Sequence, residues 1–195
     1  KYKMVVWVKD HFATVPYFAE ESRNLEAYLH AGGKLVMIGS NIMQSFMDDS
    51  YYLIAPCEPC ITYPAKFSSS GWNWFMNEIL HVNFGYIGDL IGNFNSAEGI
   101  NQYSGLVLNP DTSKIADIWP NYNKLSNVDV VIEPGGFTVP ILKLNSDDNY
   151  VDQKACGVRY YGSGFDVIYI GAPIWHMQAE DAKLLGEKIL EDMDF

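Results

Sequence analysis

Residues 25–42 read LEAYLHAGGKLVMIGSNI, and this stretch decides the predicted fold. Leu25 and Leu29 recur at the spacing of one helix face, so the first part predicts the end of a helix. Gly32 and Gly33 then end that helix, because glycine adopts the left-handed conformation that a helix C-terminus requires. The apolar run at 34–39 predicts a buried strand. The stretch therefore predicts a helix that leads directly into a buried strand.

The segments on either side extend this pattern. Met4 to Val8 is another apolar run, and it predicts a parallel strand before the helix. Strand, helix and strand together form the right-handed unit that builds parallel sheets. Further strands are predicted at 155–161 and 167–171, and a closing helix at 179–193. The sequence therefore predicts an α/β fold of three layers, with a mostly parallel sheet flanked by helices.

The middle of the chain is less regular. Residues 48–127 are rich in Pro, Ser, Gly and Asn, with a helix predicted at 71–82 and a strand at 105–108. Extended runs follow at 128–132 and 139–144. Because no repeat or low-complexity linker divides residues 1–195, we expect a single α/β domain with an insertion-rich segment at 48–127.

The charge balance disfavours several classes of partner. The chain has 13 Lys and Arg against 24 Asp and Glu, which gives a net charge of −11. Such an acidic chain is a poor ligand for nucleic acid, and no apolar run reaches the ~20 residues that cross a bilayer. The low charge content and the many Tyr and Asn residues favour a secreted or cell-surface protein. The start at Lys1 suggests a fragment of a larger polypeptide.

Polar residues follow several predicted strands, at the sheet edge where α/β folds bind ligands. Asp10 follows the first strand, Ser40 the second and His176 the last. A serine, a histidine and a carboxylate are the parts of a catalytic triad, so a serine-dependent hydrolase is one hypothesis. The turn at Ser40 lacks the second glycine of a nucleophile elbow, because Ile42 takes its place. A capping role for Ser40 is the simpler interpretation.

An acidic cluster offers oxygen ligands for calcium. It consists of Asp147, Asp148 and Asp152. The cluster lacks the alternating spacing and the final Glu of a calcium-binding loop, which favours a solvated turn. We therefore expect no cofactor, with calcium as a weak alternative.

Aromatic and cysteine residues leave two further questions open. Trp72 and Trp74 would form a glycan-binding platform if their rings were exposed, and would otherwise belong to the core. Cys57 and Cys60 are a weak zinc signal, because a closed zinc site needs four ligands. Their spacing is compatible with a local disulfide or with two free thiols.

Several stretches resemble class I glutamine amidotransferase-like domains. The pattern Tyr-Leu-x-x-Gly-Gly-Lys-Leu stands at 28–35, and the run Ile-Gly-Ser-Asn-Ile follows at 38–42. The resemblance is closer to a subgroup in secreted multidomain bacterial proteins, often beside peptidase domains, with stretches similar to 75–82 and 167–173. It implies a flavodoxin-like fold whose first strand and helix are absent from this chain.

The same resemblance implies that the family's chemistry is lost. Amidotransferases carry a cysteine at the position of Ser40, and their catalytic histidine corresponds to His176. The family has a Glu two residues after this histidine, and this chain has Gln178 there. The sequence therefore favours a non-catalytic structural or interaction module of an extracellular or cell-surface bacterial protein. Its expected partners are neighbouring domains of the same polypeptide or another surface protein. A serine hydrolase and a glycan-binding module are the alternatives.

Overall fold

The computed structural model describes residues 2–9, 18–40, 42–43, 65–68, 75–87, 94–115, 125, 128–147, 149 and 151–195. Within them, all strands join one 10-stranded sheet. The strands are β1 (Val5–Lys9), β2 (Lys34–Gly39), β3 (Ala65–Ser68), β4 (Val82–Ile87), β5 (Phe94–Gly99), β6 (Val107–Leu108), β7 (Asp129–Pro134), β8 (Thr138–Ser146), β9 (Ala155–Tyr161) and β10 (Asp166–Ile170). The helices are α1 (Phe18–His30), α2 (Thr112–Ile115), α3 (Ala179–Asp192), the π-helix η3 (Phe75–Ile79) and the 3-10 helices η4 (Asn101–Tyr103) and η5 (Ile174–His176).

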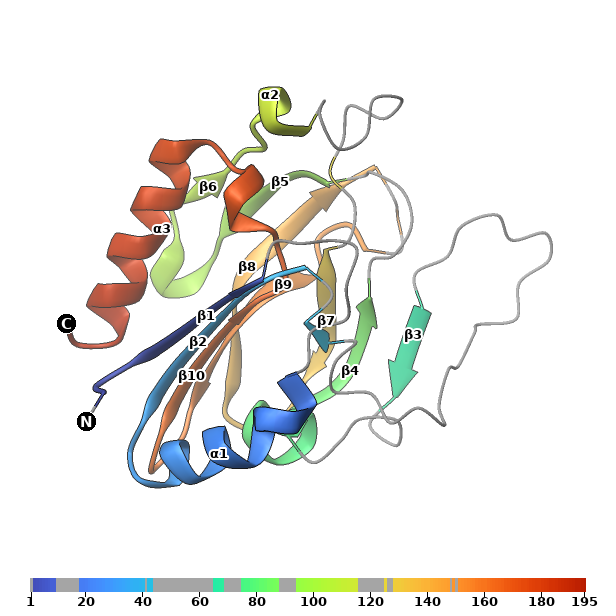
Figure 1. Ribbon diagram of the computed structural model, residues 1–195. Coiled ribbons are helices and arrows are strands. Elements are labelled where there is room, and N and C mark those ends of the chain that lie inside the picture. The colour runs from blue at the N-terminus through green and yellow to red at the C-terminus, as the bar shows by residue number, and fades with distance from the viewer. Residues whose placement is uncertain are drawn as a thin grey trace.

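The sheet is mixed and strongly curled, like half of a barrel (Figure 1). Its main path runs β1-β2-β10-β9-β7-β4-β3. β2 pairs in parallel with both β1 and β10, whereas the other described strand pairs are antiparallel. β8 branches from this path, because it pairs with both β9 and β5, and β5 in turn carries β6. Only one end of the sheet is therefore parallel.

The predicted mostly parallel, three-layer architecture is wrong, and so is the flavodoxin-like, amidotransferase-like fold that the resemblance implied. The physical reason is how the strands are connected. A short turn at 162–165 joins β9 to β10, and a connection this short makes an antiparallel pair. Register shifts interrupt the β4–β7, β5–β8 and β8–β9 pairs, and such bulges bend and twist the strands. The result is a curled mixed sheet rather than an open parallel one.

Several predicted elements are confirmed locally. β2 and β9 have the predicted bounds, β1 and β10 are each shifted by one residue at both ends, and α3 ends one residue earlier than predicted. β1, α1 and β2 form the predicted parallel unit. The sequence did not predict β3, β4 or β5, which lie within 48–127, and β4 begins at the last residue of the helix predicted at 71–82. These short strands are held by pairing with distant strands, which local patterns do not encode.

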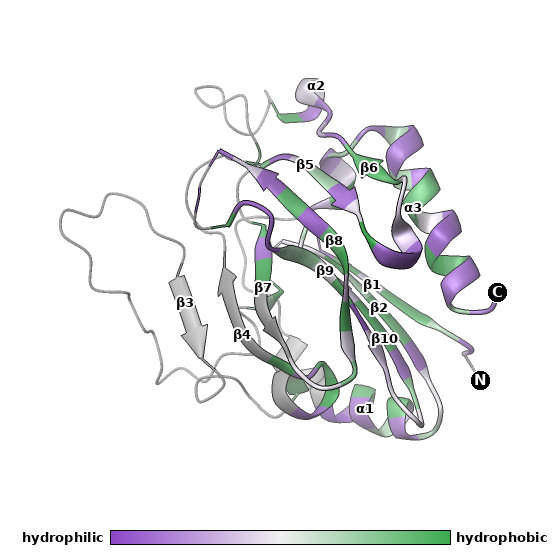
Figure 2. Ribbon diagram, turned by 180° about the vertical axis from the view of Figure 1, so that it is seen from behind, coloured by the Kyte–Doolittle hydropathy of each residue, from purple (hydrophilic) through white to green (hydrophobic). Residues whose placement is uncertain are grey.

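A hydrophobic core lies on each face of the sheet. Alternation along β2 divides its side chains, with Val36 and Ile38 facing α3, and Leu35 and Met37 facing α1 and η3. Figure 2 shows hydrophobic colour along the central strands and both colours along α3, as expected for a helix with one buried side. No helix among the described residues is long and apolar enough to cross a membrane.

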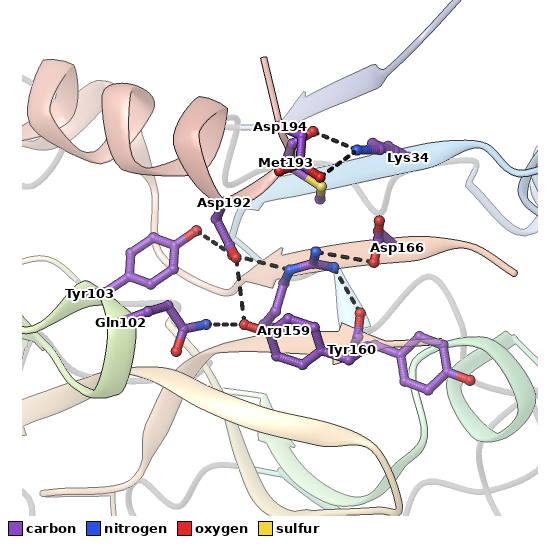
Figure 3. A network of polar contacts seen from close by, with 10 residues as sticks. Lys34, Gln102, Tyr103, Arg159, Tyr160, Asp166, Asp192, Met193 and Asp194 are labelled. Atoms are coloured by element: carbon purple, nitrogen blue, oxygen red, sulfur yellow. Dashed lines mark hydrogen bonds and ion pairs between the residues drawn. The ribbon is translucent and has the colours of Figure 1, made fainter. Parts of the chain in front are cut away.

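A buried arginine links α3 to the sheet (Figure 3). Arg159 on β9 is 2% exposed. Its Nε donates to Asp192 Oδ2 at 3.1 Å, its Nη2 lies 3.1 Å from Asp166 Oδ1, and its Nη1 donates to the Tyr160 carbonyl at 2.8 Å. The hydroxyl of Tyr103 donates to the same Asp192 oxygen at 3.1 Å. This network joins β9, β10, η4 and the last turn of α3.

We expect the Arg159→Ala variant to lose about 3 kcal/mol of unfolding free energy, because removing one partner leaves Asp192 and Asp166 uncompensated. Urea denaturation followed by circular dichroism measures this loss. The matched control is Lys143→Ala, which breaks the more exposed pair with Glu98 and should cost much less stability than Arg159→Ala. Equal losses in the two variants would contradict a special role for Arg159.

Candidate functional site

Buried polar side chains gather where the parallel strands end. Lys9 is the last residue of β1, Ser40 directly follows β2, and Asp129 begins β7 beside the end of β10. Ser40 and Asp129 are 0% exposed, and Lys9 is 8% exposed. Because ligands of α/β sheets bind outside the carboxyl ends of parallel strands, this polar edge is the natural candidate site.

Two glycines permit the close backbone contacts at this edge. Gly39 has a φ of +150°, and a Cβ there would lie 1.8 Å from the Lys9 carbonyl oxygen, so only glycine fits. The adjacent Ser40 N–H donates to that same oxygen at 3.0 Å. A Cβ on Gly171 would lie 2.4 Å from the Asp129 carbonyl oxygen. The glycines thus bring β1, β2, β7 and the end of β10 into contact.

The environment of Asp129 stabilises its protonated form. Its Oδ2 accepts hydrogen bonds from the Met43 N–H at 3.0 Å and from the Tyr169 hydroxyl at 2.5 Å. Burial raises the pKa of Asp129 to about 7, against the opposing effects of these hydrogen bonds and of the Lys9 charge. Burial also lowers the pKa of Lys9, while Asp129 raises it. Both groups therefore hold their charge less readily than in water.

Several polar atoms at this edge are buried without a hydrogen-bond partner in the described part of the chain. They are Lys9 Nζ, Ser40 Oγ and Asp129 Oδ1. A buried donor or acceptor left unpaired costs about 1–3 kcal/mol, so such groups are normally satisfied by ordered water or by a polar ligand. The edge has donors and acceptors for a small hydroxyl-bearing molecule or water, but its side chains are closed off from solvent.

The predicted triad is only partly visible. Asp10 lies outside the described residues. His176 is 3% exposed at the end of η5, where its carbonyl accepts from the Asp111 N–H at 2.7 Å. Burial and the charge of Lys114 lower the His176 pKa, and Asp111 raises it. Since the Ser40 hydroxyl makes no hydrogen bond within the described residues, the structure does not join it to His176 in this way. The triad stays a prediction.

The acidic cluster uses its carboxylates locally. Asp147 Oδ1 accepts from Asn95 at 2.8 Å, and Asp152 Oδ1 accepts from the Ser146 N–H at 2.9 Å, a bond that lowers the Asp152 pKa. Asp148 lies outside the described residues. Over the ranges that the structure covers, no group of three or more His, Cys, Asp or Glu residues has a metal-binding arrangement.

The other candidates from the sequence fall outside the described ranges, namely Trp72, Trp74, Cys57 and Cys60. The sequence analysis missed a different tryptophan, Trp175 on η5, whose side chain is 68% exposed. Lys114 Nζ lies 5.4 Å from the centre of its ring. The signal for it was its place next to His176, in the segment that follows β10.

We expect the Asp129→Asn variant to change how stability depends on pH. The folded pKa of Asp129 is about 7 against an ordinary 3.8, so folding takes up a proton between these values. This proton uptake by Asp129 contributes on the order of 4 kcal/mol to the free energy of unfolding below pH ~4, and the contribution is lost as pH rises through 7. Asparagine keeps an acceptor for Met43 and Tyr169 but cannot ionise.

The measurement is the difference in unfolding free energy between this variant and the wild type from pH 4 to pH 8. The variant should gain relative to the wild type as pH rises. Carboxylates with lowered pKa, such as Asp152, titrate in both proteins and cancel in the difference. A difference that does not change with pH would show that Asp129 ionises normally in the folded chain.

Comparison with known proteins adds information about the fold. The sequence matches no known protein family and no curated protein. Among solved structures, it is similar to Gan42B, a GH42 beta-galactosidase, with a TM-score of 0.54 and 15% identity, and to a catalytic mutant of that enzyme from G. stearothermophilus, with 0.53 and 14%. A beta-galactosidase from the Antarctic haloarchaeon Halorubrum lacusprofundi gives 0.50 and 13%.

Each alignment covers 100% of this chain and 22% of the solved chain. At such low identity the likeness shows the fold alone. It replaces the resemblance to peptidase-associated amidotransferase-like domains, which the mixed sheet contradicts. This chain therefore folds like a segment, about a fifth in length, of solved GH42 beta-galactosidases.

Proposed function

We propose that this chain is a non-catalytic module that contacts other parts of a larger polypeptide or another surface protein. The observation that carries this proposal is the burial of the reactive groups at the strand ends. Ser40 is 0% exposed and His176 is 3% exposed. A serine nucleophile needs a base within hydrogen-bond reach and a path for the substrate. An extracellular or cell-surface location, which the low charge content favours, belongs to the same proposal.

An uncovered apolar surface beside α3 supports a contact role. β1 pairs with β2 on one side and with no other described strand. Val6 and Val8 are 51% and 52% exposed, although they lie in register with the buried residues Val36 and Ile38. The helix α3 thus covers β2 but leaves β1 bare on the same face of the sheet. Natural proteins usually protect such edges with charges, prolines or bulges, and β1 has an unbroken register with β2.

The flank of α3 that adjoins β1 is also apolar. Asp181 and Asp192 contact Asn109 and Tyr103 on the side of β6 and η4. Helical spacing therefore turns Ala182, Gly186 and Leu190 toward β1. A Cβ on Gly186 would meet nothing within 4 Å, and Leu190 is 43% exposed.

We call this surface, formed by Val6, Val8, Ala182, Gly186 and Leu190, the β1–α3 face. A helix is about 10 Å wide, and neighbouring strands lie ~4.8 Å apart. If one more strand paired with β1, β1 and that strand together would be wide enough to pack against one more helix beside α3. Because the similar solved chains are more than four times longer than this one, a strand and helix from elsewhere in a longer polypeptide fit the proposal.

We expect Val6→Lys together with Val8→Lys to remove most of the binding of the hydrophobic dye ANS by the folded chain, because the lysines charge the β1–α3 face. Dye fluorescence and sedimentation velocity measure apolar exposure and self-association. Val107→Lys on β6 is the matched control, since this valine is 41% exposed away from the face. Equal dye binding by the wild type and all variants would contradict an exposed apolar β1–α3 face that binds the dye.

A separate measurement tests the absence of catalysis. We expect a fluorophosphonate probe to leave Ser40 unlabelled in the folded protein, because its hydroxyl is buried and not activated by a hydrogen-bonded base. Labelling is read by mass spectrometry, with aryl-ester turnover as a second readout. Ser104→Ala, at an exposed serine, is the control for Ser40→Ala. Labelling or turnover that only Ser40→Ala abolishes would establish the hydrolase instead.

A second candidate function, glycan binding, is favoured by exposed aromatic side chains. Phe137 is 70% exposed and Trp175 68%. Large exposed aromatic rings often mark binding surfaces, because they combine apolar area with few rotatable bonds. The similar solved structures are named as beta-galactosidases, which supports a carbohydrate context for this fold.

A further inference from the structure

Four strand termini lie side by side at the polar edge, and the two in the middle carry glycine. Lys9 ends β1, Gly39 ends β2, Gly171 directly follows β10, and Asp129 begins β7. Lys9 is in register with Gly39, and the Asp129 N–H donates to the Gly171 carbonyl at 2.8 Å. The ends of β2 and β10 therefore contribute no side chain between the two charged residues.

Lys9 and Asp129 belong to the same face of the sheet, the one that α1 covers. Val5 and Trp7 pack against the hydrophobic cluster on this face, and Lys9 follows them at the same alternate spacing. The Asp129 carboxyl group accepts from the hydroxyl of Tyr169, which belongs to that cluster. Burial raises the pKa of Asp129 and lowers that of Lys9, and each charge opposes the shift of the other. The two residues therefore form an interacting pair of buried ionisable groups.

Residues 42–43, which we call the 42–43 segment, cover the Asp129 carboxyl group. The Met43 N–H donates to Asp129 Oδ2 at 3.0 Å, and the Ile42 backbone also forms a hydrogen bond with this carboxyl group. The Ile42 and Met43 side chains are 1% and 0% exposed in the cluster on the α1 face, and neither is ionisable. Undocking of this segment would remove these hydrogen bonds and open Asp129 to water.

We propose that the protonation of Asp129 controls the docking of the 42–43 segment, which undocks more often once the proton is lost. In the docked state the carboxyl group is 0% exposed, and burial favours its neutral form. In the undocked state the carboxyl group is hydrated and ionises as an ordinary aspartate does. The proposal goes beyond the contact role proposed above, because it concerns when the polar edge meets solvent.

The direction of the pH dependence follows from the two states of Asp129. Its pKa is about 7 in the docked state, against the ordinary 3.8 of a hydrated aspartate. Undocking therefore releases a proton between these pH values, and it becomes about tenfold more favourable for each pH unit. The whole change is roughly a thousandfold. Below pH ~4 both states are protonated and above pH ~7 both are ionised, so the equilibrium is constant there.

The other described groups around Asp129 do not produce this dependence. Burial raises the pKa of Tyr169 on β10 well above its ordinary value and that of Cys156 on β9 to about 12, so both stay neutral below pH 8. The register partner on β4 is Ile87, which carries no charge. Burial lowers the pKa of Lys9, so its hydration on undocking would bind a proton and favour the docked state as pH rises. Lys9 thus acts in the opposite direction.

The test is amide hydrogen exchange, followed by NMR from pH 4 to pH 8 in the folded chain and corrected for the intrinsic exchange rate. We expect the protection of the Met43 amide to fall about tenfold for each pH unit up to pH ~7 and then to level off. The Val36 amide on β2 is the reference for global unfolding. Low concentrations of urea should reduce the protection of Val36 and leave that of Met43 nearly unchanged, because undocking exposes little surface.

Variants separate the two ionisable groups. Asp129→Asn keeps an acceptor for Met43 but cannot ionise, so the protection of the Met43 amide should no longer depend on pH. Lys9→Met removes the charge that lowers the pKa of Asp129, so the protection should level off at a higher pH. Lys154→Met, at an exposed lysine, is the matched control and should behave like the wild type.

The outcomes decide the proposal clearly. The expected pattern across the wild type and the three variants supports it. Protection of the Met43 amide that is constant with pH in the wild type overturns it. Equal protection and equal urea dependence of Met43 and Val36 also overturn it, because the opening would then be global. If Asp129→Asn does not fold, Lys9→Met decides, and a pH dependence identical to that of Lys154→Met overturns the proposal.

Discussion

The rest of the structure depends on the parallel pairing of β2 with a strand on each side. Its alternating side chains supply both hydrophobic cores, Val36 and Ile38 to one and Leu35 and Met37 to the other. At its carboxyl end the backbone of Gly39 touches Lys9 so closely that no side chain fits between them. At its amino end Lys34 holds the last residues of the chain. The polar edge and the Lys34 contacts thus lie at the two ends of one strand.

These two ends have opposite characters, and the difference matters for function. The polar edge contains ionisable groups, but they are buried, and burial suppresses the charge of both Asp129 and Lys9. At the amino end Lys34 forms an ion pair with Asp194, whose side chain is 92% exposed. Catalysis requires activated groups that a substrate can reach, whereas recognition requires only accessible complementary surface. The groups at the carboxyl end of β2 are therefore shielded from solvent, whereas the ion pair at its amino end is accessible.

The buried arginine network explains how a strongly curled sheet keeps its helix in place. Arg159 satisfies two carboxylates and a backbone carbonyl from three different elements. Such a network stabilises one docking of α3 more than any sliding alternative, because each displaced position leaves a buried charge unpaired. That fixed docking leaves β1 uncovered and sets the position of Phe195 beside Lys34.

The sequence by itself determined the local elements where apolar periodicity was strong. β2, β9 and α3 follow from runs and helical spacing that need no knowledge of distant residues. Apolar runs alone do not give strand direction, because they suit parallel and antiparallel neighbours alike. The short connection between the strands predicted at 155–161 and 167–171 does require an antiparallel pair, and the mostly parallel prediction overlooked it. The short strands within 48–127 were missed because their stability comes from pairing rather than from their own composition.

Only the tertiary structure decided the character of the candidate sites. Ser40 was found from its place after a strand, but its burial depends on contacts that no local pattern encodes. Asp129 attracted no attention in the sequence, since its raised pKa comes from burial, which no local pattern encodes. Lys34 and Asp194 are far apart in the sequence and form an ion pair only because the end of α3 lies against the start of β2. Local sequence specifies which residues prefer a strand or a helix, whereas solvent exclusion and long-range contacts exist only once the chain has folded.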